Sequence, residues 1–102
     1  MSIRHTIAGR IMKYYDWNEE KNNLLKETRN ISFEEIVFAI SNDRLLEVIE
    51  TTNKEKYPNQ KMFIVEIRDY VYIVPFIEDK EKYFLKTIYP SREATKKYLR
   101  GG

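Results

Sequence analysis

The clearest periodic pattern in the chain starts at Ser32. After this residue, apolar side chains recur at intervals of three and four positions, as in an amphipathic helix, at Phe33, Ile36, Val37 and Ile40. Ser32 and Glu35 have the spacing of a capping box, in which the Ser32 hydroxyl accepts from the Glu35 N–H and the Glu35 carboxylate accepts from the Ser32 N–H. We therefore predict a helix with one buried face that ends at Ser41-Asn42-Asp43.

Weaker patterns flank this helix on both sides. Before it, Arg10–Asp16 reads as a first strand. A helix capped by Asp16 or Asn18 then follows and ends near Asn30, and the residues expected on its apolar side are Trp17, Leu24, Leu25 and Thr28. After it, Leu45–Glu50 is either a strand or a last helical turn, and its β-branched residues favour a strand.

Three short runs of β-branched and aromatic residues follow a polar loop at Thr51–Gln60. These runs are Lys61–Ile67, Tyr70–Ile77 and Lys82–Tyr89. The links between them are too short for crossover helices, so an antiparallel meander is expected. Turns at Arg68-Asp69 and Glu78–Glu81 would place Tyr72 opposite Val65 on one side and Thr87 on the other.

Both faces of this meander are largely apolar, so each must be at least partly covered. One face carries Lys61, Phe63, Val65, Tyr72, Val74, Leu85 and Thr87, and the other carries Met62, Ile64, Glu66, Ile73, Pro75, Phe84, Lys86 and Ile88. Pro75 needs a ladder position where no N–H is required.

A final helix is predicted after Pro90, with Ser91 as its N-cap. Arg92, Lys96 and Arg100 would form a basic stripe on it, which is either a phosphate-binding surface or a solvated face. The element order is then β-α-α-β-β-β-β-α. It defines one α+β domain over residues 12–102, an antiparallel β-meander packed with two N-terminal helices and a short C-terminal helix, and residues 1–11 are interpreted as a leader.

Composition narrows the class of protein. The 102 residues include no cysteine, which excludes a disulfide scaffold, thiolate catalysis and zinc sites built from cysteine. No apolar run reaches the roughly 18–20 residues that cross a bilayer, so we expect a cytoplasmic protein with no membrane contact. Charge is unevenly distributed: residues 16–50 hold nine acidic and four basic residues, whereas residues 80–102 hold two acidic and seven basic ones. A basic C-terminal end favours an anionic partner such as nucleic acid, although lysine-rich termini also serve solubility.

Familiar catalytic motifs are missing. The glycines, Gly9, Gly101 and Gly102, form no phosphate-binding loop and no nucleophile elbow. The single histidine, His5, lies in the leader. The predicted domain therefore has no histidine for a Ser-His-Asp triad. No cofactor and no metal site is predicted.

Two segments nevertheless resemble a known family. Asp16-Trp17-Asn18-Glu19-Glu20-Lys21 followed by Ile31-Ser32-Phe33-Glu34-Glu35 is similar to the opening of the BrnT-like toxins of bacterial toxin–antitoxin pairs, which are relatives in fold of RelE-type ribonucleases. Pro90-Ser91-Arg92-Glu93-Ala94-Thr95 looks like the segment that opens the closing helix of that family.

The resemblance implies an RNA-cleaving toxin that is neutralised by a cognate small DNA-binding antitoxin and contacts operator DNA only through that antitoxin. Arg92 is then the candidate phosphate clamp, because its planar guanidinium matches a phosphate. Arg29 is a candidate second cation, and Tyr72 and Thr87 are candidates for the same groove. Lys61, Lys96 and Arg100 are candidates for holding backbone phosphates of the RNA without reading its sequence.

Two departures from the family pattern keep an alternative open. Thr28-Arg29-Asn30 stands where the family usually has lysine-histidine-glycine, and Thr87 stands where it often has a basic residue. These departures favour a non-catalytic module of the same fold that binds nucleic acid or an antitoxin-like partner.

Overall fold

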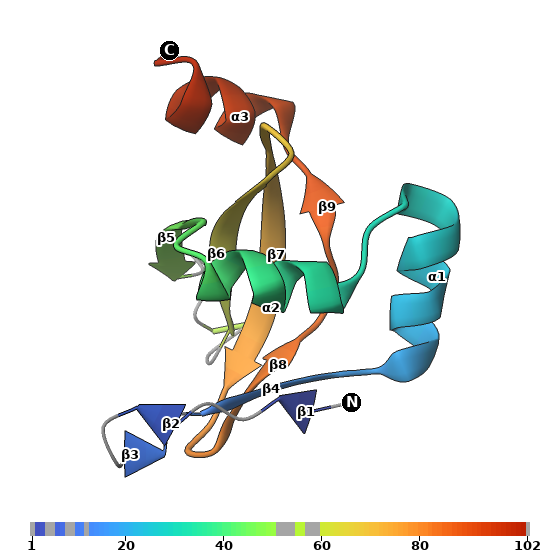
Figure 1. The fold of residues 1–102 in the computed structure, drawn as a ribbon, viewed down its shortest axis with the longest axis vertical. Helices are drawn as coiled ribbons and strands as arrows, with labels where there is room; N and C mark the ends of the chain where they lie inside the picture. The colour runs from blue at the N-terminus through green and yellow to red at the C-terminus, as the bar shows by residue number, and fades with distance from the viewer. Residues whose placement is uncertain are drawn as a thin grey trace.

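The chain folds into a mixed β-sheet with three helices among the described residues (Figure 1). The computed structural model describes residues 13–50, 55–56 and 60–101, together with the backbone of β1 (Ser2–Ile3), β2 (Thr6–Ile7) and β3 (Arg10–Ile11). The predicted polar loop at Thr51–Gln60 therefore lies mostly outside the described residues, and the boundary after residue 11 stays a prediction. The expected α+β class is confirmed.

Seven strands form the main sheet of the described chain. The order is β1-β4-β8-β7-β6-β5, and β9 also pairs with β7. The bounds are β4 (Tyr14–Trp17), β5 (Leu45–Glu50), β6 (Gln60–Ile67), β7 (Tyr70–Glu78), β8 (Lys82–Leu85) and β9 (Tyr89–Pro90). β6, β7 and β8 are joined as antiparallel neighbours, as predicted. Leu45–Glu50 is a strand, as the β-branched residues favoured, and it pairs antiparallel with β6.

The sheet also contains a parallel pair that the sequence did not predict. β4 pairs with β8 in parallel, with Tyr14 opposite Lys82 and Trp17 opposite Leu85. A parallel pair needs a long crossover, and here both N-terminal helices and three strands lie between the partners. The prediction paired strands by the length of the links between them, and link length carries no information about strands so far apart in sequence.

The first helix, α1 (Glu19–Arg29), is capped as expected but turns a different side inward. The Asn18 side chain accepts from the Lys21 N–H, and Asn30 ends the helix in the left-handed region. Leu25 is buried, whereas Leu24 is 50% exposed and Thr28 is exposed, so the predicted apolar side is wrong at two positions.

A buried polar residue explains the orientation of α1. Asn22 is fully buried, and its Oδ1 accepts from the Phe33 N–H at 2.8 Å while its Nδ2 donates to Glu34 Oε1 at 2.7 Å. The first amides of a helix have no partner within that helix, so the Asn22 side chain supplies one of them for the next helix. This contact joins α1 to the start of α2.

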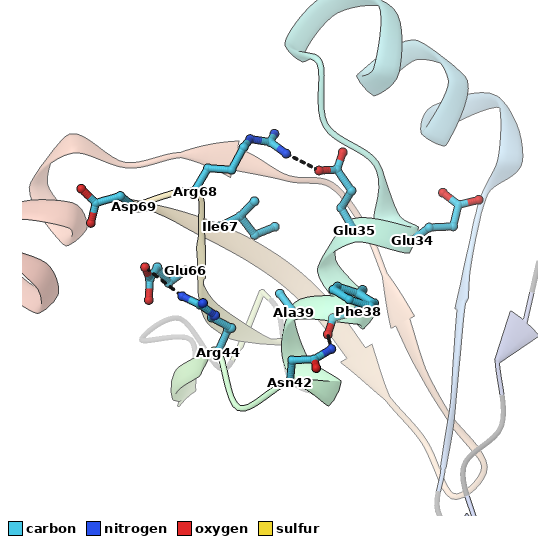
Figure 2. A pocket seen from close by; sticks show the side chains of 10 residues that line it. All are labelled: Glu34, Glu35, Phe38, Ala39, Asn42, Arg44, Glu66, Ile67, Arg68 and Asp69. Atoms are coloured by element: carbon cyan, nitrogen blue, oxygen red, sulfur yellow. Dashed lines mark hydrogen bonds and ion pairs between the residues drawn. The ribbon is translucent and has the colours of Figure 1, made fainter.

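The second helix, α2 (Phe33–Ser41), follows the predicted pattern closely. Phe33, Ile36 and Val37 are buried, and the helix crosses the sheet at β6 (Figure 1). Ser32 Oγ accepts from the Glu35 N–H, but the other half of the predicted capping box is wrong. The Glu35 carboxylate instead accepts from Arg68 Nη1 at 2.8 Å, because the β6–β7 turn brings this guanidinium to α2 (Figure 2).

The predicted strand Lys82–Tyr89 is divided into β8 and β9. The Pro75 carbonyl accepts from the Lys86 N–H at 2.8 Å, so the nitrogen of Pro75 faces the connection at residues 86–88. Proline has no N–H to donate there, and the ladder is interrupted beside it. β9 resumes with Tyr72 opposite Pro90, so the predicted pairing of Tyr72 with Thr87 is wrong.

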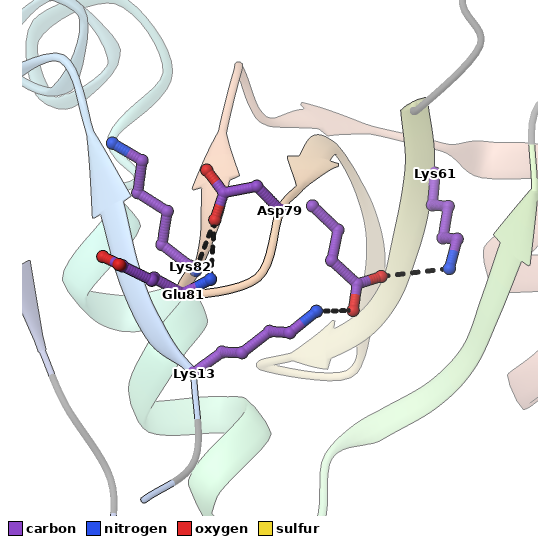
Figure 3. Close-up of polar contacts among 6 residues, drawn as sticks. Lys13, Lys61, Asp79, Glu81 and Lys82 are labelled. Carbon is purple, nitrogen blue, oxygen red and sulfur yellow. Dashed lines mark hydrogen bonds and ion pairs between the residues drawn. The ribbon is translucent and has the colours of Figure 1, made fainter.

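The β7–β8 turn also differs from its prediction. Glu78 pairs with Tyr83, so the turn does not begin at Glu78. Asp79 Oδ1 accepts from the Glu81 N–H at 2.8 Å and from the Lys82 N–H at 2.9 Å (Figure 3). These two bonds hold the pKa of the Asp79 carboxyl below its usual value and fix the position of the turn.

The predicted inner face of the sheet is confirmed at its centre. The core contains Phe63, Val65, Val74 and Leu85 together with residues from α1, α2 and β4. Trp17 and Phe33 stack in this core with ring centroids 5.6 Å apart. Ile88 was assigned to the opposite face but belongs to this core, because the break beside Pro75 shifts the pairing after it by one residue.

Candidate functional site

The third helix, α3 (Arg92–Leu99), carries the basic residues predicted to bind phosphate. Ser91 Oγ accepts from the Ala94 N–H at 3.0 Å, which confirms Ser91 as the N-cap. The buried Thr95 hydroxyl donates to the Ser91 carbonyl at 2.7 Å and accepts from the Val71 N–H at 2.8 Å. A third bond, from the Ser91 N–H to the Val71 carbonyl at 2.9 Å, fixes the start of α3 on β7.

The three members of the predicted basic stripe are all exposed, but their partners differ. Among the described residues, no hydrogen bond or ion pair occupies the Arg92 guanidinium or the Lys96 ammonium. Arg100 Nη1 lies 3.3 Å from Asp69 Oδ2 in the β6–β7 turn, and both side chains are more than half exposed. Such a pair is weak in water, so Arg100 remains open to competition from an anion.

Arg29 and Thr87 are brought close to one connection of the chain. The Arg29 guanidinium, at the end of α1, donates to the carbonyl of Ile88, which is the next residue after Thr87. The connection at residues 86–88 leads through β9 directly to Arg92. Arg29 therefore ties α1 to the segment that positions Arg92, and at least one of its N–H groups is already used.

Tyr72 lies on the next strand from this segment. It is half-buried against the core, and its ring is 6.0 Å from that of Tyr70 in an edge-to-face arrangement. Its backbone pairs with Pro90, two residues before Arg92. The Tyr72 backbone therefore lies near the start of α3, but its side chain packs on the core and its hydroxyl interacts with Arg68. Thr87 is displaced along the strand toward Pro75.

Lys61 is not brought to this region. It lies four residues before Val65, the partner of Tyr72, which corresponds to about 13 Å along the strand. Its ammonium lies 3.0 Å from Glu78 Oε1, and Lys13 donates to the other oxygen of the same carboxylate (Figure 3). Hydrogen bonds from Lys13 and Lys61 lower the pKa of Glu78, and the Glu78 carboxylate raises the pKa of Lys61.

A hollow of about 1050 Å³ lies on another part of the surface, between α2 and the β6–β7 turn (Figure 2). We call it the α2 hollow. None of the residues predicted as site residues lines it, and the lining consists of Glu34, Glu35, Phe38, Ala39, Asn42, Arg44, Glu66, Ile67, Arg68 and Asp69. The one sequence signal for it is Phe38, an aromatic residue off the buried face of α2 that remains 71% exposed.

Comparison with known proteins identifies no relative. No protein-family model, curated protein or solved structure matches the chain. Within the described residues, no helix is both long and apolar enough to cross a membrane, and no three acidic, histidine or cysteine side chains are grouped as metal ligands.

Proposed function

We propose that the chain is an endoribonuclease toxin of a toxin–antitoxin pair, with Arg92 as the residue that binds the RNA phosphate. The observation that carries the proposal is the state of Arg92. It is exposed in the first turn of α3, and no described residue occupies its guanidinium. Had this guanidinium been locked to an internal carboxylate, it could not bind an external phosphate.

The chemistry requires three things of the site. The ribose 2′-OH must lose a proton, the added negative charge on phosphorus must be stabilised, and the leaving oxygen must gain a proton. The Arg92 guanidinium supplies the second of these with its planar fork of donors, and the positive end of α3 lies beside it. The Tyr72 hydroxyl interacts with Arg68, so in this proposal Tyr72 acts through the β7–β9 ladder that positions the start of α3.

Other residues have supporting roles in the proposal. Lys96 and Arg100 hold neighbouring phosphates along α3, on the same exposed stripe. Arg29 acts through the connection that it binds, by fixing the approach to Arg92. Lys61 has no part in the RNA site, because it is paired with Glu78 at the other end of β6.

The second candidate is a non-catalytic module of the same fold that binds nucleic acid or an antitoxin-like partner. The engagement of Arg29 with the Ile88 carbonyl favours it, since this leaves Arg92 without a second unpaired arginine beside it. In the toxin proposal the protein partner is a cognate small DNA-binding antitoxin, and operator DNA is reached only through it.

Expression with and without the neighbouring gene separates the two candidates. The toxin proposal expects growth arrest that is relieved by co-expression of the neighbour and by Arg92→Ala, with RNA cleavage by the purified protein lost in the same variant. Lys61→Ala is the matched control and should keep both activities, because Lys61 lies outside the site. Harmless overexpression together with intact RNA in vitro would contradict the toxin and support the binding module.

A further inference from the structure

The α2 hollow has the size and shape of a docking surface. Its volume of about 1050 Å³ is at the upper end of the range for ligand pockets. One wall is the outer side of α2, and the other is the end of β6 with the β6–β7 turn (Figure 2). A hollow open along a helix accommodates a side chain together with the backbone that carries it.

The apolar part of the α2 hollow is exposed to water. Phe38 is 71% exposed and lies at the hollow with Ala39 and Ile67, which are buried (Figure 2). Phe38 is the most exposed of the large apolar residues in the described part of the chain. An exposed aromatic ring beside a hollow is a typical anchor point at protein interfaces, because burying it removes a large apolar area from water.

The charges around the hollow select the partner. Both lining arginines are already paired with lining glutamates, Arg68 with Glu35 at 2.8 Å and Arg44 with Glu66 at 3.2 Å. The remaining charged residues of the lining are Glu34 and Asp69, and the partner of Asp69 is Arg100, which lies outside the lining in an exposed and therefore weak pair. The lining itself thus carries a net negative charge. The Glu34 carboxyl stays ionised at neutral pH, since its pKa is lowered despite partial desolvation, by the Asn22 side chain and by backbone and lysine contacts.

The turn at the edge of the hollow is strained. Arg68 and Asp69 have φ of 53° and 64°, the left-handed conformation that two-residue hairpin turns require and that asparagine and glycine adopt with less cost. Each side chain is held from a different helix, Arg68 by Glu35 of α2 and Asp69 by Arg100 next to α3. Strained residues gather at sites that bind or switch, where the surrounding contacts maintain them.

We propose that the α2 hollow docks a segment of another protein that presents an apolar side chain flanked by lysine or arginine. The apolar side chain packs on Phe38, and the flanking cations face Glu34 and Asp69. A nucleic acid does not fit this surface, because its phosphates would meet a lining of net negative charge. This inference does not depend on RNA cleavage and holds for either candidate function.

Synthetic peptides of defined composition test the proposal on the intact chain. Three helical peptides are compared: one of leucine, alanine and lysine, one in which glutamate replaces lysine, and one in which serine replaces leucine. Only the first is expected to bind in fluorescence anisotropy, and the backbone amide shifts that it causes should centre on Phe38, Ala39 and the turn at Arg68-Asp69. Equal binding of the glutamate peptide would overturn the proposal.

Variants sharpen the test. Phe38→Ser should lower the affinity for the lysine peptide by about tenfold or more, as expected for an interface anchor. Leu24→Ser, which alters another exposed apolar residue on α1 outside the hollow, should leave binding unchanged. Because Phe38 is exposed, its variant should keep the thermal midpoint. Unchanged binding by Phe38→Ser, or displacement of the peptide by single-stranded RNA from the hollow, would contradict a protein docking site.

Discussion

Arg92 and Arg29 carry the same guanidinium group but have different partners. Arg92 is exposed and joined to no described residue, whereas Arg29 donates to the backbone of the connection that leads to Arg92. One arginine is available to a phosphate, and the other stabilises the chain that positions it. Sequence analysis predicted that both arginines would bind phosphate. The partner of each could not be predicted, because it depends on contacts between distant parts of the chain.

Asn22 is the residue whose role the sequence pattern concealed. Sequence analysis assigned no role to this polar residue, yet it is fully buried and bonds to the Phe33 N–H and to Glu34. Asn22→Ala should lower the free energy of unfolding by about 2 kcal/mol, because it leaves a buried N–H without an acceptor. Urea unfolding measures this change.

Asn23→Ala provides the matched control on the same helix. Asn23 is exposed, and its variant should change the free energy of unfolding by less than about 0.5 kcal/mol. Equal effects of the two substitutions would show that the bond from the Phe33 N–H to Asn22 does not stabilise the fold.

Among the elements, those defined by local sequence were predicted well. Asn18, Ser32 and Ser91 cap their helices as expected, since each cap is specified within four residues. The two-residue turn at Arg68-Asp69 and the pairing of Val65 with Tyr72 are also confirmed. The parallel β4–β8 pair could not be predicted, because no local signal indicates which free strand edge a distant strand will join.

The interruption beside Pro75 shows how one residue redirects an element. Sequence analysis identified that Pro75 lacks the donor that a ladder needs, but not which neighbour would be affected. The neighbour is the strand after β7, which separates into β8 and β9 and changes register between them. As a result, Tyr72 pairs with Pro90 and not with Thr87. The start of α3, which follows Pro90, therefore lies beside β7.

The β6–β7 turn should be more stable with residues suited to its backbone. The double substitution Arg68→Asn and Asp69→Gly removes left-handed strain at both positions and loses two exposed ion pairs. We expect a net gain of about 1 kcal/mol in the free energy of unfolding, since exposed pairs contribute little. Thermal unfolding of this variant measures the gain. Lys80→Asn, which changes an exposed residue in the β7–β8 turn, is the control. A loss of stability would mean that the ion pairs outweigh the strain.

At the scale of the whole molecule, the uneven charge of the sequence separates into two surfaces. The basic stripe of α3 and the acidic α2 hollow both border the β6–β7 turn, where Arg68 contacts α2 and Asp69 contacts Arg100. The basic end was predicted from the charge of the C-terminal segment. The hollow was not, because it is formed by a helix and a turn that are separated in sequence.

The salt dependence of RNA binding tests the central claim about Arg92 most directly. For single strands, each neutralised phosphate adds about −0.7 to the slope of log affinity against log salt concentration. The account predicts a negative slope for the unaltered chain, a slope shallower by about 0.7 for Arg92→Ala, and an unchanged slope for Lys61→Ala. A flat dependence, or the same slope with and without Arg92, would contradict the assignment of Arg92 as the phosphate-binding residue.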